Sequence, residues 1–192
     1  MIEDFLKYTF NKCYNSSFKY ELYKEDIEKS VNLLFQDVHF HYPDLKENEI
    51  ITSVEKNSSW LPVLFYRLGN TIYKRANKDP LLSDLHGLMR EICSMEIYFS
   101  IEIGTGFEVR HGIGSVIGSR CSIGQGFILH HGCTLGHKYK FGNGPILGNH
   151  VEMGANSSIL GEINVGDYVV IGAHSLILNH VPDNSKVYGL HK

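Results

Sequence analysis

The sequence lacks the features that mark membrane and nucleic-acid-binding proteins. No stretch of its 192 residues approaches the about 20 apolar residues of a membrane-spanning helix. The first residues show no basic region followed by an apolar run, so we expect no secretion signal. Lys and Arg number 18 against 21 Asp and Glu, and a formal net charge of -3 provides no basic surface for nucleic acid. We expect a cytoplasmic protein.

Cysteine is scarce and scattered. The four cysteines form no C-x-x-C pair, and they are Cys13, Cys93, Cys121 and Cys133. This spacing argues against a disulfide framework or a zinc site, and we expect reduced thiols. The 11 histidines lack the H-x-x-x-H spacing of a helical metal site, so we expect no catalytic metal.

Residues 1–95 have the spacing of amphipathic helices. One helix face is marked at the i, i+3, i+4 and i+7 positions by Val31, Leu34, Phe35 and Val38. Residues 58–75 and 79–98 are also amphipathic. Serines that precede the first of these segments are available to cap it, and Pro62 falls in its first turn, where proline is tolerated. We expect a helical region over 1–95 whose apolar stripes are mainly packing surface.

A six-residue repeat replaces this pattern from Ile101 onwards. After Ile103, Val109 and a shift of phase, eleven apolar residues recur every six positions: Ile117, Ile123, Leu129, Leu135, Phe141, Leu147, Met153, Ile159, Val165, Ile171 and Ile177. Eight of the eleven are followed directly by Gly. A helix repeats near 3.6 and an alternating strand at 2, so neither explains the spacing.

Short strands separated by sharp corners fit a period of six. The apolar residue points into a narrow core, and the next residue takes a corner conformation that Gly tolerates best. Each coil then hydrogen-bonds to the coils above and below it. We predict a parallel β-helix of hexapeptide repeats over residues 96–192, after the helical region of 1–95.

These motifs resemble the left-handed β-helix acyltransferases, and most closely the serine acetyltransferases and related polysaccharide O-acetyltransferases. The resemblance covers roughly 58–189 and is carried by FYRLGNTIY (65–73), IGTGFEVRHGIGSVIG (103–118), HHGCTLG (130–136), MGANSSILGEINVGDYVVIGAHSLIL (153–178) and VPDNSKVYG (181–189). It implies three hexads per coil, about four to five coils, and acetyl-CoA as acyl donor. It also implies a homotrimer with active sites between neighbouring subunits; whether trimers pair through 1–95 stays open.

His111 is the candidate general base. It lies at the shift of phase between Val109 and Ile117, where a loop or bulge is expected, and it matches the family's catalytic histidine. An imidazole is suited to removing a hydroxyl proton near neutral pH. The resemblance also calls for an orienting carboxylate, and counting back without a gap gives Glu96, where the family prefers Asp. Glu102 and Glu108 are the alternatives, and Glu96 could instead be a solvated carboxylate at a helix end.

The resemblance also provides a set of acetyl-CoA residues. Backbone groups of the late coils are expected to contact the pantetheine arm, and the matching residues are Gly136, His137, Gly154, Ala155, Gly172 and Ala173, with Lys186 near the phosphates. Glycine in such repeats is also a corner residue, so a structural role is the alternative for each. His137 stands where the family has a second Gly, and its N–H remains available to the thioester oxygen.

The acceptor alcohol is the least determined part. Counting back places Asp44 at the family's acceptor-binding Asp, but Arg110 stands where another Asp precedes the catalytic histidine, and no Arg-His pair occurs in 135–148. Arg110 is expected to repel the ammonium of serine. We therefore place a sugar or polysaccharide hydroxyl first and serine second, with a non-catalytic β-helix scaffold as the third hypothesis. The chain ends at GLHK without the family's apolar tail, so we do not expect cysteine synthase as a partner.

Overall fold

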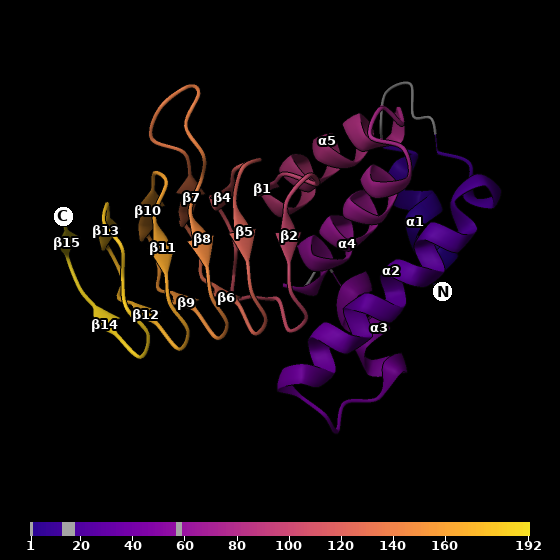
Figure 1. Ribbon diagram of the computed structural model, residues 1–192. Helices are drawn as coiled ribbons and strands as arrows, with labels where there is room; N and C mark the ends of the chain where they lie inside the picture. Colours follow the sequence, from indigo (N-terminus) through magenta and orange to yellow (C-terminus); the bar gives the residue numbers. More distant parts are fainter. Residues whose placement is uncertain (1, 13–17, 57–58) are drawn as a thin grey trace.

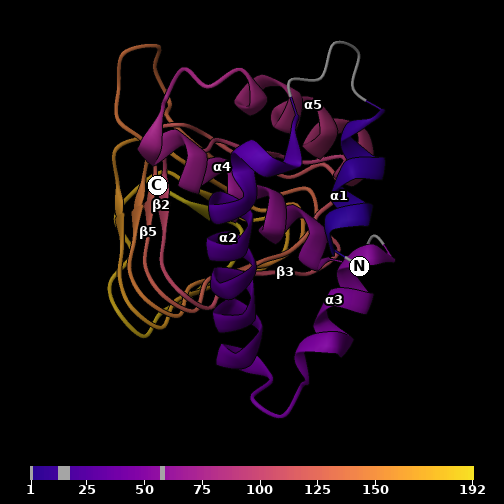
Figure 2. The ribbon, with the colours of Figure 1, turned by 90° about the vertical axis from the view of Figure 1, so that its right-hand side faces the viewer.

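The computed structural model describes residues 2–12, 18–56 and 59–192 and shows a helical region followed by a coil of short parallel strands (Figure 1). Cys13 lies outside the described residues. The helices of these ranges are α1 (Ile2–Phe10), α2 (Tyr20–His41), α3 (Glu47–Glu55), α4 (Trp60–Arg75) and α5 (Leu81–Cys93). Seen along the coil, the helices lie over its first end (Figure 2). No helix within the described residues is long and apolar enough to span a membrane.

The strands form three parallel sheets, which we call A, B and C. Sheet A runs in the order β1 (Glu96–Ile97), β4 (Val116–Ile117), β7 (Thr134–Gly136), β10 (Ser158–Leu160), β13 (Leu176–Ile177) and β15 (Leu190–His191). Sheet B runs β11 (Asn164–Val165), β8 (Ile146–Leu147), β5 (Ser122–Ile123) and β2 (Glu102–Ile103). Sheet C runs β14 (Lys186–Val187), β12 (Val170–Ile171), β9 (Glu152–Met153), β6 (Ile128–Leu129) and β3 (Glu108–Val109).

Consecutive strands belong to different sheets, and each strand pairs with one on the next coil. On sheet C, Glu108 is opposite Ile128, and Ile128 is opposite Glu152. Residues at equivalent positions of successive coils therefore form columns that run along the axis of the coil. This arrangement confirms the predicted parallel β-helix of hexapeptide repeats.

The repeated apolar residues fill the core of the coil, with one exception. Ten of the eleven in-phase positions are at most 4% exposed, whereas Phe141 is 89% exposed. Phe141 lies between β7 and β8, in the loop that projects from the coil (Figure 1). The interruption has the length of one hexad, so the six-residue phase continues through a segment that forms no strand. The prediction that Phe141 is a core residue was wrong for this reason.

Helices α2 and α4 are joined to the first coil by a buried ion pair. Arg67 donates two hydrogen bonds to the carboxylate of Asp37, at 2.7 and 2.8 Å, and two more to the carbonyl oxygens of Ile103 and Gly104. Asp37 also accepts from the backbone N–H of Gly106 at 2.9 Å. The Asp37–Arg67 pair thus fixes the helical region to the end of β2 and to the turn that leads into β3.

The predicted helices are confirmed, with two local corrections. Leu34 and Val38 of α2 are fully buried. Ser59 precedes α4 but makes no capping hydrogen bond with its side chain. Helix α5 ends at Cys93, because Ser94 takes a left-handed conformation with φ +52°, and the residues that follow form β1 rather than a last helical turn.

Candidate active site

His111 lies at the corner where the chain passes from sheet C to sheet A. The step from Val109 to Ile117 is two residues longer than a hexad, and the predicted interruption is found there. His111 has φ +69°, and its side chain is exposed. The ring of His131, at the same corner of the next coil, lies 6.2 Å from that of His111 between centroids.

A cavity of about 310 Å³ opens beside His111, between the start of α4, the end of α5 and the first coil. It is lined by Ser59, Pro62, Ile92, Cys93, Ser94, Met95, His111 and Ile113. The backbone N–H of His111 donates to Ser59 Oγ at 3.4 Å, so the serine expected to cap α4 contacts the base residue instead. Burial raises the pKa of the Cys93 thiol to about 12. The cavity thus offers a small, mostly neutral space next to an imidazole.

Glu96 lies near this cavity but does not contact His111 within the described residues. It stands in β1, 3.9 Å from Arg90 between Oε2 and Nε, and lines a neighbouring cavity of about 290 Å³. The two cavities share Ser94 and Met95. Of the alternative carboxylates, Glu102 lies on sheet B in an ion pair with Lys74, and Glu108 is buried on sheet C. Over residues 2–12, 18–56 and 59–192, no carboxylate is therefore hydrogen-bonded to the imidazole of His111.

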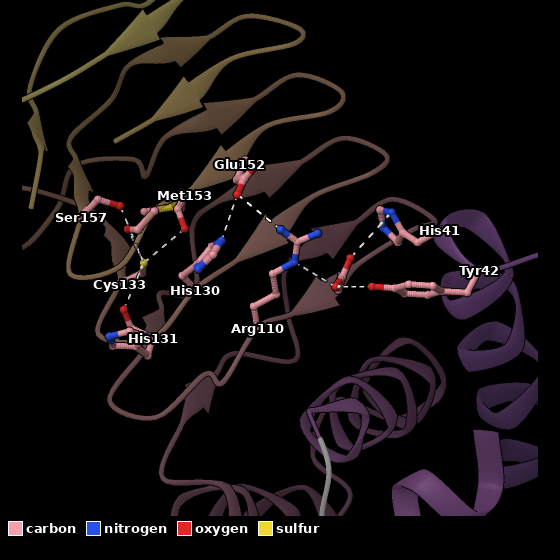
Figure 3. A network of polar contacts seen from close by, with 11 residues as sticks. His41, Tyr42, Arg110, His130, His131, Cys133, Glu152, Met153 and Ser157 are labelled. Carbon is pink, nitrogen blue, oxygen red and sulfur yellow. Dashed lines mark hydrogen bonds and ion pairs between the residues drawn. The ribbon is translucent and has the colours of Figure 1, made fainter. Parts of the chain in front are cut away.

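Arg110 stands between two carboxylates on sheet C (Figure 3). Its Nε donates to Glu108 Oε1 at 3.0 Å, and its Nη1 lies 3.6 Å from Glu152 Oε1. His130 Nε2 is 2.9 Å from the same Glu152 oxygen. The hydrogen bond to Glu108 raises the pKa of Arg110, which therefore stays charged. Two carboxylates thus face one guanidinium, so the positive charge of Arg110 is balanced by its neighbours.

The end of α2 supports this cluster from the other side. Tyr42 Oη donates to Glu108 Oε1 at 3.0 Å, and burial raises the pKa of the Tyr42 phenol. Glu108 Oε2 is buried, has no hydrogen bond to any residue that the structure describes, and lies 3.7 Å from His41 Nδ1. Asp44 follows in the turn after α2, where it is exposed and lines a separate cavity with His41 and Tyr42. The structure thus places Asp44 beside the cluster rather than in the cavity of His111.

The residues expected to contact acetyl-CoA lie on two different corners. Gly136 ends β7 at the corner that leads from sheet A to sheet B, and His137 is the exposed residue after it. A Cβ atom at Gly136 would meet no atom within 4 Å, so its surface is open. Ala155 and Ala173 lie instead on the corner of His111 and His131, because each follows a strand of sheet C. One face of the coil separates the two groups.

Packing accounts for one of the expected glycines and contributes at a second. A Cβ atom at Gly154 would lie 2.8 Å from the backbone nitrogen of Ala173, and one at Gly172 would lie 2.2 Å from the ring of Tyr188. Gly154 is required because the backbone of the next coil passes too closely for a Cβ atom, whereas the neighbour of Gly172 is the exposed ring of Tyr188. Ala155 and Ala173 lie at the corner between sheets C and A. Lys186 is exposed on sheet C, in the column of Glu108 and Glu152.

Sequence reasoning missed Glu108 and Glu152 as partners of Arg110, and Ser59 as a contact of His111. The repeat contained the signal for Glu152, because residues that precede the buried apolar residue on successive coils of one sheet stack in a column. Ser59 and the cavity gave no such signal, since helices and coil meet there by tertiary packing. Among the described residues, no group of three or more His, Cys, Asp or Glu side chains could hold a metal ion.

Comparison with known proteins gives one consistent family. No profile of a protein family matches the chain. The chain is 40% identical over 129 residues to a serine acetyltransferase of Helicobacter pylori, covering 66% of this chain and 75% of that protein. It is 32% identical over 167 residues to the serine acetyltransferase of Staphylococcus xylosus, covering 85% and 74%.

Solved structures agree with these relatives. The Neisseria gonorrhoeae serine acetyltransferase superposes with a TM-score of 0.73 at 27% identity, covering 88% of this chain and 69% of that one. A structure of the same enzyme in complex with serine gives a TM-score of 0.74 at 26% identity, covering 88% and 71%. Much of the helical region is included in this match, because the match covers 88% of the chain and the coil begins only at Glu96.

Proposed function

The chain belongs to the serine acetyltransferase family and is an acyltransferase, and we propose that it moves an acetyl group from acetyl-CoA to the hydroxyl of L-serine. One observation supports this most directly. The single imidazole at the break in the repeat, His111, is exposed beside a cavity of about 310 Å³, at the corner that also carries Ala155 and Ala173. The serine acetyltransferase relatives indicate an enzyme, which argues against a non-catalytic scaffold.

The comparisons favour the acceptor that the sequence analysis placed second. The relatives named above are serine acetyltransferases, and none of them is a polysaccharide O-acetyltransferase. The sugar hypothesis had two arguments, the charge of Arg110 and the missing Arg-His pair in 135–148. The two carboxylates beside Arg110 answer the first of them. L-Serine is therefore the acceptor that we propose.

His111 acts as the general base in this proposal. Its imidazole takes the proton of the acceptor hydroxyl while the hydroxyl oxygen attacks the thioester carbonyl carbon. Backbone N–H groups, of which that of His137 is the candidate from the resemblance, stabilise the negative charge on the carbonyl oxygen. The C–S bond then breaks, and His111 returns its proton to the departing thiolate, which leaves as CoA. Glu96 is the carboxylate proposed to orient the imidazole, and this role requires its side chain to turn from Arg90 towards His111.

The acetyl-CoA arm is proposed to lie in a cleft between two copies of the chain. Gly136 and Ala155 sit on different corners of one coil, so a single copy does not place both against one linear arm. A homotrimer brings one corner of each copy against a different corner of its neighbour. This arrangement would place the open surface of Gly136 from one subunit opposite Ala155 and Ala173 of the next.

The test is release of CoA from acetyl-CoA by the purified protein, with L-serine compared against nucleotide-sugars and capsular oligosaccharides. We expect turnover with L-serine and formation of O-acetylserine, identified by mass spectrometry. Turnover with a sugar and none with L-serine would restore the sugar hypothesis. Absence of turnover with every acceptor, from a folded protein, would contradict the activity itself.

A further inference from the structure

We propose that Arg110 and Glu152 together bind the charged groups of the amino-acid acceptor, Arg110 its carboxylate and Glu152 its ammonium. The inference rests on the proposed serine acceptor. The sequence analysis expected Arg110 to repel the ammonium of serine. In this proposal Arg110 instead attracts the carboxylate of the same molecule.

Arg110 is held in place at one atom and left open at the others. Its Nε donates to the buried Glu108, whose side chain is 6% exposed and is itself held by Tyr42 (Figure 3). The Arg110 side chain as a whole is 40% exposed. A guanidinium has five N–H donors in a fixed plane, so anchoring Nε fixes the direction in which the remaining donors point.

Arg110 and Glu152 both have unused hydrogen-bonding capacity. Their 3.6 Å separation is longer than a hydrogen bond, and within the described part of the chain neither Nη atom of Arg110 donates one. Glu152 uses only Oε1, which faces His130 and Arg110, and its Oε2 accepts no hydrogen bond among the described residues. The Glu152 side chain is 34% exposed. A ligand can therefore reach a donor set and an acceptor that lie side by side.

The charges of the pair match a zwitterion. A free amino acid carries a carboxylate and an ammonium on the same carbon, and each would meet a group of opposite charge here. Guanidinium and carboxylate form parallel paired hydrogen bonds, which fixes orientation as well as charge. An acidic sugar would meet Glu108 and Glu152 as well as Arg110, so the cluster disfavours it.

The position of the pair is compatible with transfer at His111. Arg110 directly precedes His111, and Glu152 lies on the same sheet two coils further along. Coils of a parallel sheet are about 4.8 Å apart, so Glu152 lies roughly 10 Å along the axis from the coil of His111. The Arg110 side chain crosses that interval, because its backbone adjoins His111 while its Nη1 lies 3.6 Å from Glu152 Oε1.

Competition between charge-deleted acceptors tests the two halves separately. L-Serine kinetics are measured for wild type, Glu152→Gln and Arg110→Gln, with ethanolamine and 3-hydroxypropanoate as competing ligands. Glu152→Gln is expected to weaken L-serine and ethanolamine at least tenfold, and 3-hydroxypropanoate less than twofold. Arg110→Gln is expected to weaken L-serine and 3-hydroxypropanoate at least tenfold, and ethanolamine less than twofold. The KM for acetyl-CoA should stay within twofold in both.

Matched variants separate binding from folding. Glu152→Asp keeps the charge and should recover most of the affinity for L-serine, whereas Glu28→Gln makes the same chemical change on the exposed surface of α2 and should change nothing. Should Glu152→Gln fail to fold, Arg110→Gln tests the carboxylate half on its own. Equal weakening of both competitors in a folded variant, or an unchanged KM for L-serine, would overturn the inference. Wild type that acetylates no L-serine would overturn the proposed function and this inference together.

Discussion

At the scale of single residues, the backbone of His111 is not what sets it apart. Its φ of +69° is shared in kind by other non-glycine corner residues, including His150, Tyr168 and His174, at +56 to +59°. The left-handed conformation costs such residues about 1–2 kcal/mol, and here it recurs wherever the coil turns. His111 differs in lying at the interruption of the repeat, beside a cavity that helices α4 and α5 complete.

Replacing His111 therefore should affect rate and not folding. We expect His111→Ala to lower kcat/KM for L-serine by about 10²–10⁴, the usual contribution of a general base, with an unchanged far-ultraviolet circular dichroism spectrum. His150→Ala is the matched control, because His150 has the same corner conformation with φ +56° on another edge of the coil. Comparable losses in both variants would contradict the role of His111.

The thiol in the same cavity should be inert at neutral pH. The thiolate is the reactive form, and burial raises the pKa of Cys93 to about 12, so the thiolate appears only as pH rises well above 8. At pH 8 we expect iodoacetamide to alkylate Cys93 about 10³-fold more slowly than free cysteine, whose pKa is about 8.5. Mass spectrometry of the peptide that contains Cys93 measures this rate. Modification at the rate of free cysteine would contradict the burial.

At the scale of elements, helices α2 and α4 depend on one buried ion pair. Arg67→Met would leave Asp37 fully buried and without its partner, which we expect to cost about 3–5 kcal/mol. Arg75→Met is the control, because Arg75 is 50% exposed in its ion pairs with Asp26 and Asp79 and should cost about 1 kcal/mol or less. Urea denaturation followed by circular dichroism compares the two. Equal costs would show that burial does not decide the strength of these pairs.

Loop 137–145 and strand β8 give another contrast within the repeat. Phe141 and Leu147 occupy the same phase, but Phe141 is 89% exposed and Leu147 is 3% exposed. We expect Phe141→Ser to change the free energy of unfolding by about 0.5 kcal/mol or less. Leu147→Ala should cost about 2–5 kcal/mol because it leaves a cavity in the narrow core. Equal costs would mean that the loop is packed as a regular hexad.

At the scale of the whole molecule, the two groups of acetyl-CoA residues imply sites shared between copies. Chains with His111→Ala and chains with Gly136→Leu should each form inactive assemblies, because one lacks the base and the other fills the open surface at Gly136. When the two variants are mixed in equal amounts and reassembled, the mixture should recover about one quarter of wild-type activity. Each interface needs an intact His111 from one chain and an intact Gly136 from its neighbour, and random assembly gives this combination at about one interface in four.

Two observations would contradict the shared site. Analytical ultracentrifugation should give the mass of three copies of the 21.8 kDa chain for wild type and for the mixture. A monomeric mass together with full activity would remove the need for a second copy. No recovery in a mixture that does form trimers would place both corners at the same subunit's site.

The regular parts of this protein were predictable because their residues interact with the residues that a fixed spacing brings together. The hexads from Ile117 to Ile177 determine the apolar core of the coil. The spacing of Val31, Leu34, Phe35 and Val38 determines a helix face. The break at His111 was visible for the same reason, as a departure from the period. Phe141 was mispredicted because an insertion of one hexad leaves the period unchanged.

The sequence by itself determined the repeat, the helical lead-in and the position of the candidate base. The tertiary structure alone decided what surrounds that base. Arg110 reads as a free positive charge along the chain, but Glu152 lies 42 positions later and reaches it only because the coil stacks their strands on one sheet. Charge acts through space, over a few ångströms, so the electrostatics of a site depend on which distant residues folding brings together.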